Sequence, residues 1–255
     1  MSFHINITEL AILLSILLRL SIILFMLPVF SSAGAPPSVK ALIVLSLSIM
    51  LFPVVKQHIR PVPFDLAGLT SVIIGELIYG ILFALSMLLI ISAFHLAGEL
   101  IGFEMGFGFS QTADPQTGAK FTVLSVWTQL LATLIFLSID GHHTVLKILV
   151  ESFKTVPIGS FVFDSSRIGK VFLLSATLFT LAIKLASPVL AVLVLTQIGL
   201  GLMSKFAPQI NILATGFPMT IGLGMFFLGL TIMLWGEIGA DSFAGIFDCL
   251  GNLSK

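Results

Sequence analysis

The stretch LAGLTSVIIGELIYGILFALSMLLIISAF, residues 66–94, decides the class of fold. It exceeds the about 20 apolar residues that a helix needs to cross a bilayer, and its one charged side chain is Glu76. Because lipid leaves the backbone groups of open strands unsatisfied, we expect this stretch to be helical. It is long enough to tilt, kink or break.

Five further apolar blocks flank this stretch, at about 7–30, 39–55, 121–139, 171–203 and 210–236. Only 9% of the 255 residues are charged, against about 25% in a typical soluble domain. A soluble protein with so few charged residues could not cover its surface with well-hydrated side chains. The sequence therefore predicts an all-α integral membrane protein with about six apolar helical blocks, in contact with membrane lipid, that form kinked or broken hairpins. The polar run at about 140–170 is expected to be a loop with some amphipathic helix.

Several function classes are excluded by what the sequence lacks. The net charge is zero, so no nucleic-acid partner is expected, and the single Cys249 cannot form a disulfide within the chain. The run Asp140-Gly141-His142-His143 invites a metal site, but the other histidines are scattered, so we expect no metal and no cofactor. The sequence shows no catalytic-triad order, no GxSxG motif and no Walker loop, so we do not expect an enzyme.

Charged residues inside or beside the apolar blocks need an explanation, because burying a charge in a membrane is costly. A proton or ion path is one interpretation, and ion pairs between helices, snorkelling or a protein-lined lumen are the other. We favour the second, because a proton path usually shows several clustered acids. Arg19 and Lys184 are the expected partners of Glu76, Glu99 or Glu104, and the sequence does not fix which residue pairs with which. The intramembrane polar set is Arg19, Glu76, Glu99, Glu104, Lys184 and Glu237.

The run HLAGELIGFEMGFGFSQTADPQTGAK, residues 95–120, follows the long apolar stretch directly. Gly98, Gly102 and Gly106 recur every four residues, so on a helix they form a stripe against which another backbone can pack closely. After Gly106 the pattern becomes a loop that carries Phe107 and Phe109. Sequence physics leaves two interpretations open: a constriction or plug, or an ordinary packing stripe followed by a surface loop.

A second unusual stretch, Ser187–Pro218, predicts a helical hairpin with a tight polar tip at Ser204–Asn211. Pro188 is expected to kink the first arm, because proline lacks the N–H that a helix needs. Lys205 at the tip has two interpretations: it meets a lipid phosphate, or the tip docks a partner.

Four ordered runs together carry a family likeness. They are AGELIGFEMG at 97–106 followed by Asp114-Pro115; Gly141-His142-His143 with Ser152-Phe153 and Pro157-Ile158-Gly159; Ser187-Pro188-Val189; and Gly199-Leu200-Gly201-Leu202 through Ala207-Pro208-Gln209-Ile210-Asn211 with Gly216-Phe217-Pro218. In this order they resemble the FliR family of flagellar export-gate proteins, which is homologous to the SctT family of virulence secretion systems. The likeness runs from the first apolar block to Glu237.

The resemblance implies a function and a set of partners. A FliR-like protein would be a structural and gating subunit of a type III protein export gate, built with FliP-like and FliQ-like subunits. It would lie in the bacterial inner membrane within the flagellar basal body, contact FlhB and FlhA, and pass unfolded export substrates. Residues 1–170 would form a FliP-like part, and residues 171–255 a FliQ-like hairpin with a short tail.

The resemblance also assigns roles to particular residues. The family's plug loop corresponds to about 106–118 here, and the partner-docking tip, which FlhB would contact, to about 204–211. Lys205 departs from the pattern because many relatives carry Arg there, and Lys184 is an additional cation. The residues involved are Gly106, Phe107, Gly108, Phe109, Gln111, Thr112, Asp114 and Pro115 in the plug; Gly98, Gly102 and Gly106 in helix packing; and Lys205, Pro208, Gln209 and Asn211 in the tip.

The alternative function is a secondary transporter for a small solute. It would use intramembrane charges such as Glu76, Lys184 and Glu237, and would be expected to show repeats in the two halves of the chain. The sequence shows no such repeat.

Overall fold

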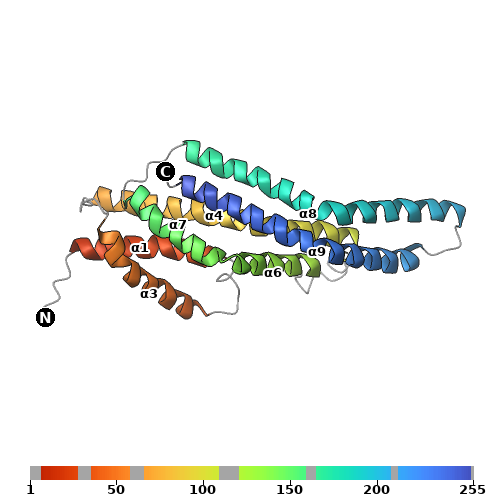
Figure 1. Cartoon of the computed structure of the whole chain (residues 1–255), viewed down its shortest axis with the longest axis horizontal. Coiled ribbons are helices and arrows are strands. Elements are labelled where there is room, and N and C mark those ends of the chain that lie inside the picture. Colours follow the sequence, from red (N-terminus) through yellow and green to blue (C-terminus); the bar gives the residue numbers. More distant parts are fainter. Residues whose placement is uncertain are drawn as a thin grey trace. The chain divides into compact units, whose positions relative to one another are not determined.

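The computed structural model describes residues 7–27, 36–57, 66–108, 121–158, 165–207 and 212–253. Helices account for nearly all of these residues, and no strand occurs among them (Figure 1). The prediction of an all-α protein is therefore confirmed. The helices are α1 (Ile7–Met26), α3 (Pro37–Lys56), α4 (Leu66–Glu104), α6 (Val123–Ser138), α7 (Gly141–Thr155), α8 (Ser165–Phe206) and α9 (Ile212–Leu253).

Five of the described helices are long and apolar enough to cross a membrane: α1, α3, α4, α8 and α9. The spanning segments of these helices have mean hydropathies between 1.9 and 2.5. Helices α6 and α7 bend by 66° at a short break and together would make a sixth span. The chain is a membrane protein.

Several helices are longer than the apolar blocks that predicted them. Helix α4 continues past residue 94 to Glu104, and α9 continues past residue 236 to Leu253. The predicted blocks were bounded at the polar side chains His95 and Glu237, whereas the helices continue past them and their apolar spans reach Glu104 and Gly251. The region predicted as mainly loop contains α7, whose buried Val145, Leu149 and Ser152 share one helical face.

The chain forms two compact units, and neither is continuous in sequence. The first comprises Met1–Leu89, Asp140–Ser175 and Phe243–Lys255, and the second comprises Ile90–Ile139 and Ala176–Ser242. The first contains α1, α3 and α7, and the second contains α6. The long helices α4, α8 and α9 contribute to both units.

Helix α8 stays helical through Pro188. Proline has no N–H, so the carbonyl oxygen of Lys184, four residues earlier, loses its usual donor. The Ser187 hydroxyl donates to this oxygen instead, at 3.1 Å. A side chain thus satisfies a backbone group that the proline leaves open, which explains why α8 is not interrupted here.

Candidate functional site: polar junctions on helix α4

The first polar junction on α4 is an ion pair between Arg19 of α1 and Glu76. Both side chains are almost inaccessible, at 0% and 1% exposure. The guanidinium engages the carboxylate through two atoms: Nη2 donates to Oε1 at 2.8 Å, and Nε donates to Oε2. This two-point geometry is the arrangement in which an arginine binds a carboxylate best.

Helix α7 completes the surroundings of Arg19. Nη1 donates to the Ser152 hydroxyl at 3.1 Å, and Nη2 also donates to the Val156 carbonyl at 3.2 Å. The guanidinium carbon lies 4.6 Å from the ring centre of Tyr79 and 4.2 Å from that of Phe153. Arg19 therefore links three helices of the first unit, and both its hydrogen-bonding edge and its planar faces are engaged.

This arrangement decides what the pair can do chemically. A carboxylate that carries or releases ions has to be reached by water or by the ion. Glu76 is buried and neutralised by a cation that itself donates four hydrogen bonds. The pair is therefore a structural brace, as expected for charges paired inside a membrane protein.

The second junction joins α4 to the start of α6 in the second unit. Thr122 caps α6: its hydroxyl accepts from the Ser125 N–H at 3.2 Å. The same hydroxyl and the Thr122 N–H both donate to Glu99 Oε2 at 3.0 Å. A carboxylate at the N-terminus of a helix also suits the positive end of the helix dipole.

Glycines allow this close approach. A Cβ added at Gly98 would lie 2.8 Å from the Ser125 Cα, and one at Gly102 would lie 2.7 Å from the Thr122 hydroxyl oxygen. The Thr128 hydroxyl also donates to the Phe94 carbonyl of α4 at 2.9 Å. Side chains at the two glycine positions would push the helices apart.

Helix α4 ends in a Schellman motif at Gly106. The Phe107 N–H donates to the Gly102 carbonyl at 2.9 Å, and the Gly106 N–H donates to the Phe103 carbonyl at 3.0 Å. Gly106 has φ +94°, a left-handed conformation that glycine adopts without strain. The third glycine of the predicted stripe thus also terminates the helix.

Side chains of α8 and α9 contact the end of α4. The Gln197 amide donates to Glu104 Oε2 at 2.6 Å, and the Thr220 hydroxyl donates to the Met105 carbonyl at 3.3 Å. A Cβ at Gly106 would come within 2.5 Å of the Phe217 ring, and one at Gly224 within 2.7 Å of Met105. Side chains of both α8 and α9 thus fix the point at which α4 ends.

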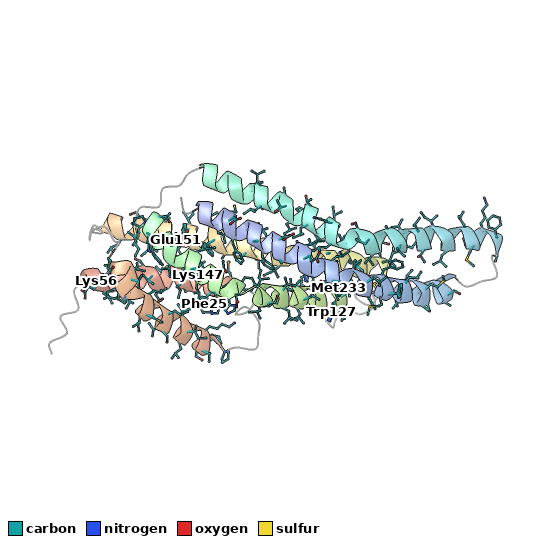
Figure 2. All side chains as sticks on the ribbon, in the orientation of Figure 1. Phe25, Lys56, Trp127, Lys147, Glu151 and Met233 are labelled. Atoms are coloured by element: carbon teal, nitrogen blue, oxygen red, sulfur yellow. The ribbon has the colours of Figure 1, made fainter. Side chains whose placement is uncertain are left out.

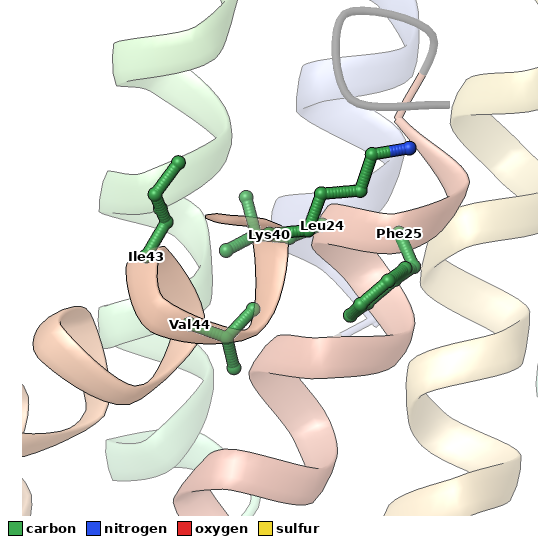
Figure 3. Close-up of a pocket in the computed structure, with 5 residues that line it drawn as sticks. All are labelled: Leu24, Phe25, Lys40, Ile43 and Val44. Carbon is green, nitrogen blue, oxygen red and sulfur yellow. The ribbon is translucent and has the colours of Figure 1, made fainter. Parts of the chain in front are cut away.

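Other candidate features are less enclosed. Possible ligand atoms of Asp140, His142 and His143 lie within 4.8 Å of one another, but Asp140 and His143 are exposed, so we assign no metal to them. A shallow depression between α1 and α3 is lined by Leu24, Phe25, Lys40, Ile43 and Val44 (Figure 3). It is too shallow to enclose a ligand, whereas typical ligand pockets bury most of the ligand's surface.

The remaining predicted site residues fall into two groups. Lys184, Lys205 and Glu237 are exposed, and within the described part of the chain none of them forms an ion pair. The structure therefore gives Lys184 none of the acidic partners expected for it. Outside the described residues lie Phe109, Gln111, Thr112, Asp114 and Pro115 of the plug and Pro208, Gln209 and Asn211 of the tip.

Comparison with known proteins identifies the family. The family model for bacterial export proteins, family 1, matches residues 10–246. The chain belongs to this family. It is 30% identical to the flagellar biosynthetic protein FliR of Pectobacterium carotovorum subsp. carotovorum, over 89% of this chain and 86% of the relative. It is 28% identical to that of Escherichia coli (strain K12), over 93% and 90%, and 30% identical to that of Aquifex aeolicus (strain VF5), over 85% and 83%. The resemblance to FliR is confirmed.

The sequence of this family 1 export protein did not predict the residues that complete the α4 junctions. Ser152, Gln197 and Thr220 each bind an α4 or α1 group from far along the chain, and no local pattern indicates such pairs. A signal did exist for α6, where Thr122, Ser125 and Thr128 place hydroxyls every three residues on one buried face. A small polar stripe of this kind matches the glycine stripe of α4.

Proposed function

We propose that this chain is a structural and gating subunit of the flagellar type III protein export gate, and that it forms the secretion channel with FliP and FliQ. The observation that carries the proposal is the similarity along most of the chain to flagellar biosynthetic proteins named FliR. Membership of an export family and several membrane-spanning helices support it. The site of action is the bacterial inner membrane, within the flagellar basal body.

The exposed apolar surface supports a role as one subunit of a larger assembly. Only 17%, 28% and 22% of the spanning segments of α3, α8 and α9 are buried within the chain. Phe206 and Met233 are more than four-fifths exposed, and Met233 on α9 is labelled in Figure 2. Such large apolar surfaces mark contacts with protein or membrane. FliP-like and FliQ-like neighbours and membrane lipid would cover them.

The gating part of the proposal concerns residues 106–118. The Schellman motif ends α4 in a firmly held turn at Gly106, where this segment begins, and residues 109–120 lie outside the described residues. We assign the plug to this segment, with Phe107 and Phe109 as the obstructing rings. Deleting Phe107–Gln111 should make the gate leaky to ions, measured as a loss of membrane potential. A deletion variant that stays ion-tight and exports normally would contradict the plug assignment.

The proposal also assigns different roles to the N-terminal and C-terminal parts of the chain. Residues 1–170 act as a FliP-like part, and residues 171–255 as a FliQ-like hairpin built from α8 and α9. The hairpin tip, with Lys205, is assigned to contact FlhB, and FlhA and unfolded export substrates complete the list of partners. The exposure of Lys205 and Phe206 within the tip supports this assignment.

The structure offers little support for a small-solute transporter. A transporter of this kind would use Glu76 as a binding or proton-carrying group. The Glu76 carboxylate accepts hydrogen bonds from Nε and Nη2 of Arg19 and is buried from solvent.

The deciding experiment is native mass spectrometry of the tagged chain, expressed in place of the host's own copy and purified in mild detergent. We expect one large complex that contains several FliP-like and FliQ-like subunits. Motility and secretion of flagellar proteins in the same strain serve as the functional readout. Recovery as a stable monomer or homodimer, or full motility in a strain that lacks the chain, would overturn the proposal.

A further inference from the structure

The first residues of the plug segment, residues 106–118, are packed against the last turn of α4. The Phe107 N–H donates to the Gly102 carbonyl at 2.9 Å, and a Cβ added at Gly108 would clash with the Phe103 ring. Hydrogen bonding and close packing therefore fix the backbone of Phe107, one of the two rings assigned to the obstruction. This backbone can move only if the turn at the end of α4 moves with it.

Helix α9 holds this turn by close packing within the second unit. The Met105 side chain is fully buried, and a Cβ added at Gly224 would come within 2.7 Å of it. The Thr220 hydroxyl, on a residue that is 7% exposed, donates to the Met105 carbonyl at 3.3 Å. The Phe217 ring fills the space that a Cβ at Gly106 would need. Because these contacts are enclosed by protein, we expect α9 and the end of α4 to move together.

Helix α8 holds the same turn through the Gln197 amide. Gln197 Nε2 donates to Glu104 Oε2 at 2.6 Å and to the Glu104 carbonyl oxygen at 3.3 Å. Gln197 is exposed, in contrast to the buried Met105 and Thr220. A hydrogen bond to a charged group contributes more than one between neutral groups, yet this exposed one can break without opening a packed core. The Gln197 contact is therefore the one that can open at the lowest cost.

The surroundings of Gln197 favour the closed state of this contact. The exposed side chains beside it on α8 are apolar: Val194, Leu195 and Ile198. Gln197 also lies inside the spanning segment Phe172–Phe206. A low local dielectric strengthens a hydrogen bond between polar groups and makes it costly to leave them apart. The amide and the Glu104 carboxylate should therefore stay paired until the helices are displaced.

We propose that Gln197 is a positioning residue of the gate. Its amide holds the end of α4, and with it the start of the plug segment, in the closed position, and the hydrogen bond to Glu104 breaks when the gate opens. The inference rests on the proposed function, because it takes residues 106–118 as the plug. It adds that helix α8, and not only the plug sequence, determines how firmly the channel is closed.

Substitutions at Gln197 test this role in the purified complex. Proteoliposomes that contain the complex are loaded with potassium, and the rate of potassium loss measures the leak. Gln197→Glu places a second carboxylate beside Glu104 and should raise the leak about tenfold or more, because like charges in contact repel. Gln197→Leu removes the donor and should raise the leak less. Thr196→Ala is the matched control, because the Thr196 hydroxyl donates to the Val192 carbonyl within α8.

Exchanging the two groups separates their pairing from other effects of the substitutions. Glu104→Gln combined with Gln197→Glu restores a hydrogen bond between an amide and a carboxylate, with donor and acceptor exchanged. The double variant should therefore leak less than either single variant, which two independent effects could not produce. A double variant that leaks as much as Gln197→Glu, or a Gln197→Glu complex as tight as Thr196→Ala, would overturn the inference.

A reversible crosslink tests whether the contact has to open during export. Glu104→Cys and Gln197→Cys are introduced into a chain in which Cys249 is replaced by Ser. Oxidation follows assembly, so the crosslink cannot interfere with folding. The crosslinked complex should stay ion-tight and lose at least about nine-tenths of its export, as expected for a tenfold shift in a gating equilibrium, and reduction should restore export. Export at the unaltered level by a fully crosslinked complex would overturn the inference.

The plug deletion distinguishes a failure of this inference from a failure of the proposed function. If deleting Phe107–Gln111 leaves the complex ion-tight, the plug assignment itself is wrong. If the deletion makes the complex leak while Gln197→Glu stays tight and the crosslinked complex still exports, the plug assignment stands and this inference alone fails.

Discussion

Arg19 shows how one residue can determine the local architecture of a membrane protein. Its guanidinium binds Glu76 on α4, the Ser152 hydroxyl on α7 and the Val156 carbonyl just beyond α7. A buried ion pair gains little net stability over apolar side chains, but breaking one half leaves an uncompensated charge. Arg19 and Glu76 are therefore better understood as a device that fixes which helices meet than as a source of stability.

Replacing Glu76 by Gln should destabilise the protein strongly. The change leaves the Arg19 charge buried without its counter-ion, at a cost of roughly 3–5 kcal/mol. Thermal unfolding in detergent, followed by intrinsic fluorescence, measures the effect. The control is the double replacement of Arg19 and Glu76 by Met, which removes both charges and should be less destabilising than Glu76→Gln alone. A double variant that is less stable than Glu76→Gln would contradict the interpretation of the pair as a structural brace.

Replacing Gly106 by Ala should also destabilise the protein. The added Cβ would meet the Phe217 ring at 2.5 Å, and alanine would have to adopt φ +94°. Strain of this kind costs about 1–3 kcal/mol. Gly169→Ala is the control, because a Cβ there meets nothing within 4 Å. Equal melting temperatures of the two variants would contradict the helix-end assignment.

At the scale of elements, the contact between α4 and α6 depends on small residues. Gly98→Ala should be more harmful than Gly102→Ala, because the first Cβ meets the Ser125 backbone and the second meets the Thr122 side chain. Overpacking a close helix contact costs about 1–3 kcal/mol. Combining Gly102→Ala with Thr122→Ala should relieve the contacts with the Thr122 Oγ1 and Cγ2 atoms, but the double variant still lacks the hydroxyl that caps α6. Double-mutant analysis of melting temperatures tests this coupling, and purely additive effects would argue against it.

The N-cap of α6 gives a second prediction at this scale. Thr122→Ala removes the hydroxyl that caps α6 and one of the hydrogen bonds to Glu99. The expected cost is about 0.5–2 kcal/mol, whereas Thr122→Ser keeps the hydroxyl and should cost less. Hydrogen exchange of the first turn of α6 would report the difference. Unchanged protection in Thr122→Ala would show that the cap is dispensable.

The helices also show which features of the fold the sequence could predict. Apolar length predicted the spanning helices, and glycine spacing predicted a close-packing stripe, because both depend on neighbouring residues. The apolar blocks stopped before the ends of α4 and α9, because they were bounded at the polar side chains His95 and Glu237 and the helices continue past them, whereas the glycine stripe did predict helix up to Gly106. The pairing of Arg19 with Ser152 across 133 positions has no local signal, and only the fold reveals it.

At the scale of the whole molecule, the apolar surfaces of α3, α8 and α9 predict dependence on partners. Expressed without FliP-like and FliQ-like subunits, the chain should aggregate or be degraded, because these surfaces stay uncovered. Co-expression should shift it into a single detergent-stable species, measured by size-exclusion chromatography and immunoblotting. A monodisperse and long-lived chain expressed alone would contradict this expectation.

The brace at Arg19 has a consequence for how the protein is made. The ribosome completes α1 before it synthesises Glu76, 57 positions later, and well before Ser152. A lone arginine at the centre of a membrane helix raises the free energy of insertion by about 2.5–3.5 kcal/mol. Helix α1 therefore carries this cost until Glu76 on α4 has been synthesised and can pair with Arg19. A later part of the nascent chain thus removes an insertion cost that an earlier part introduced.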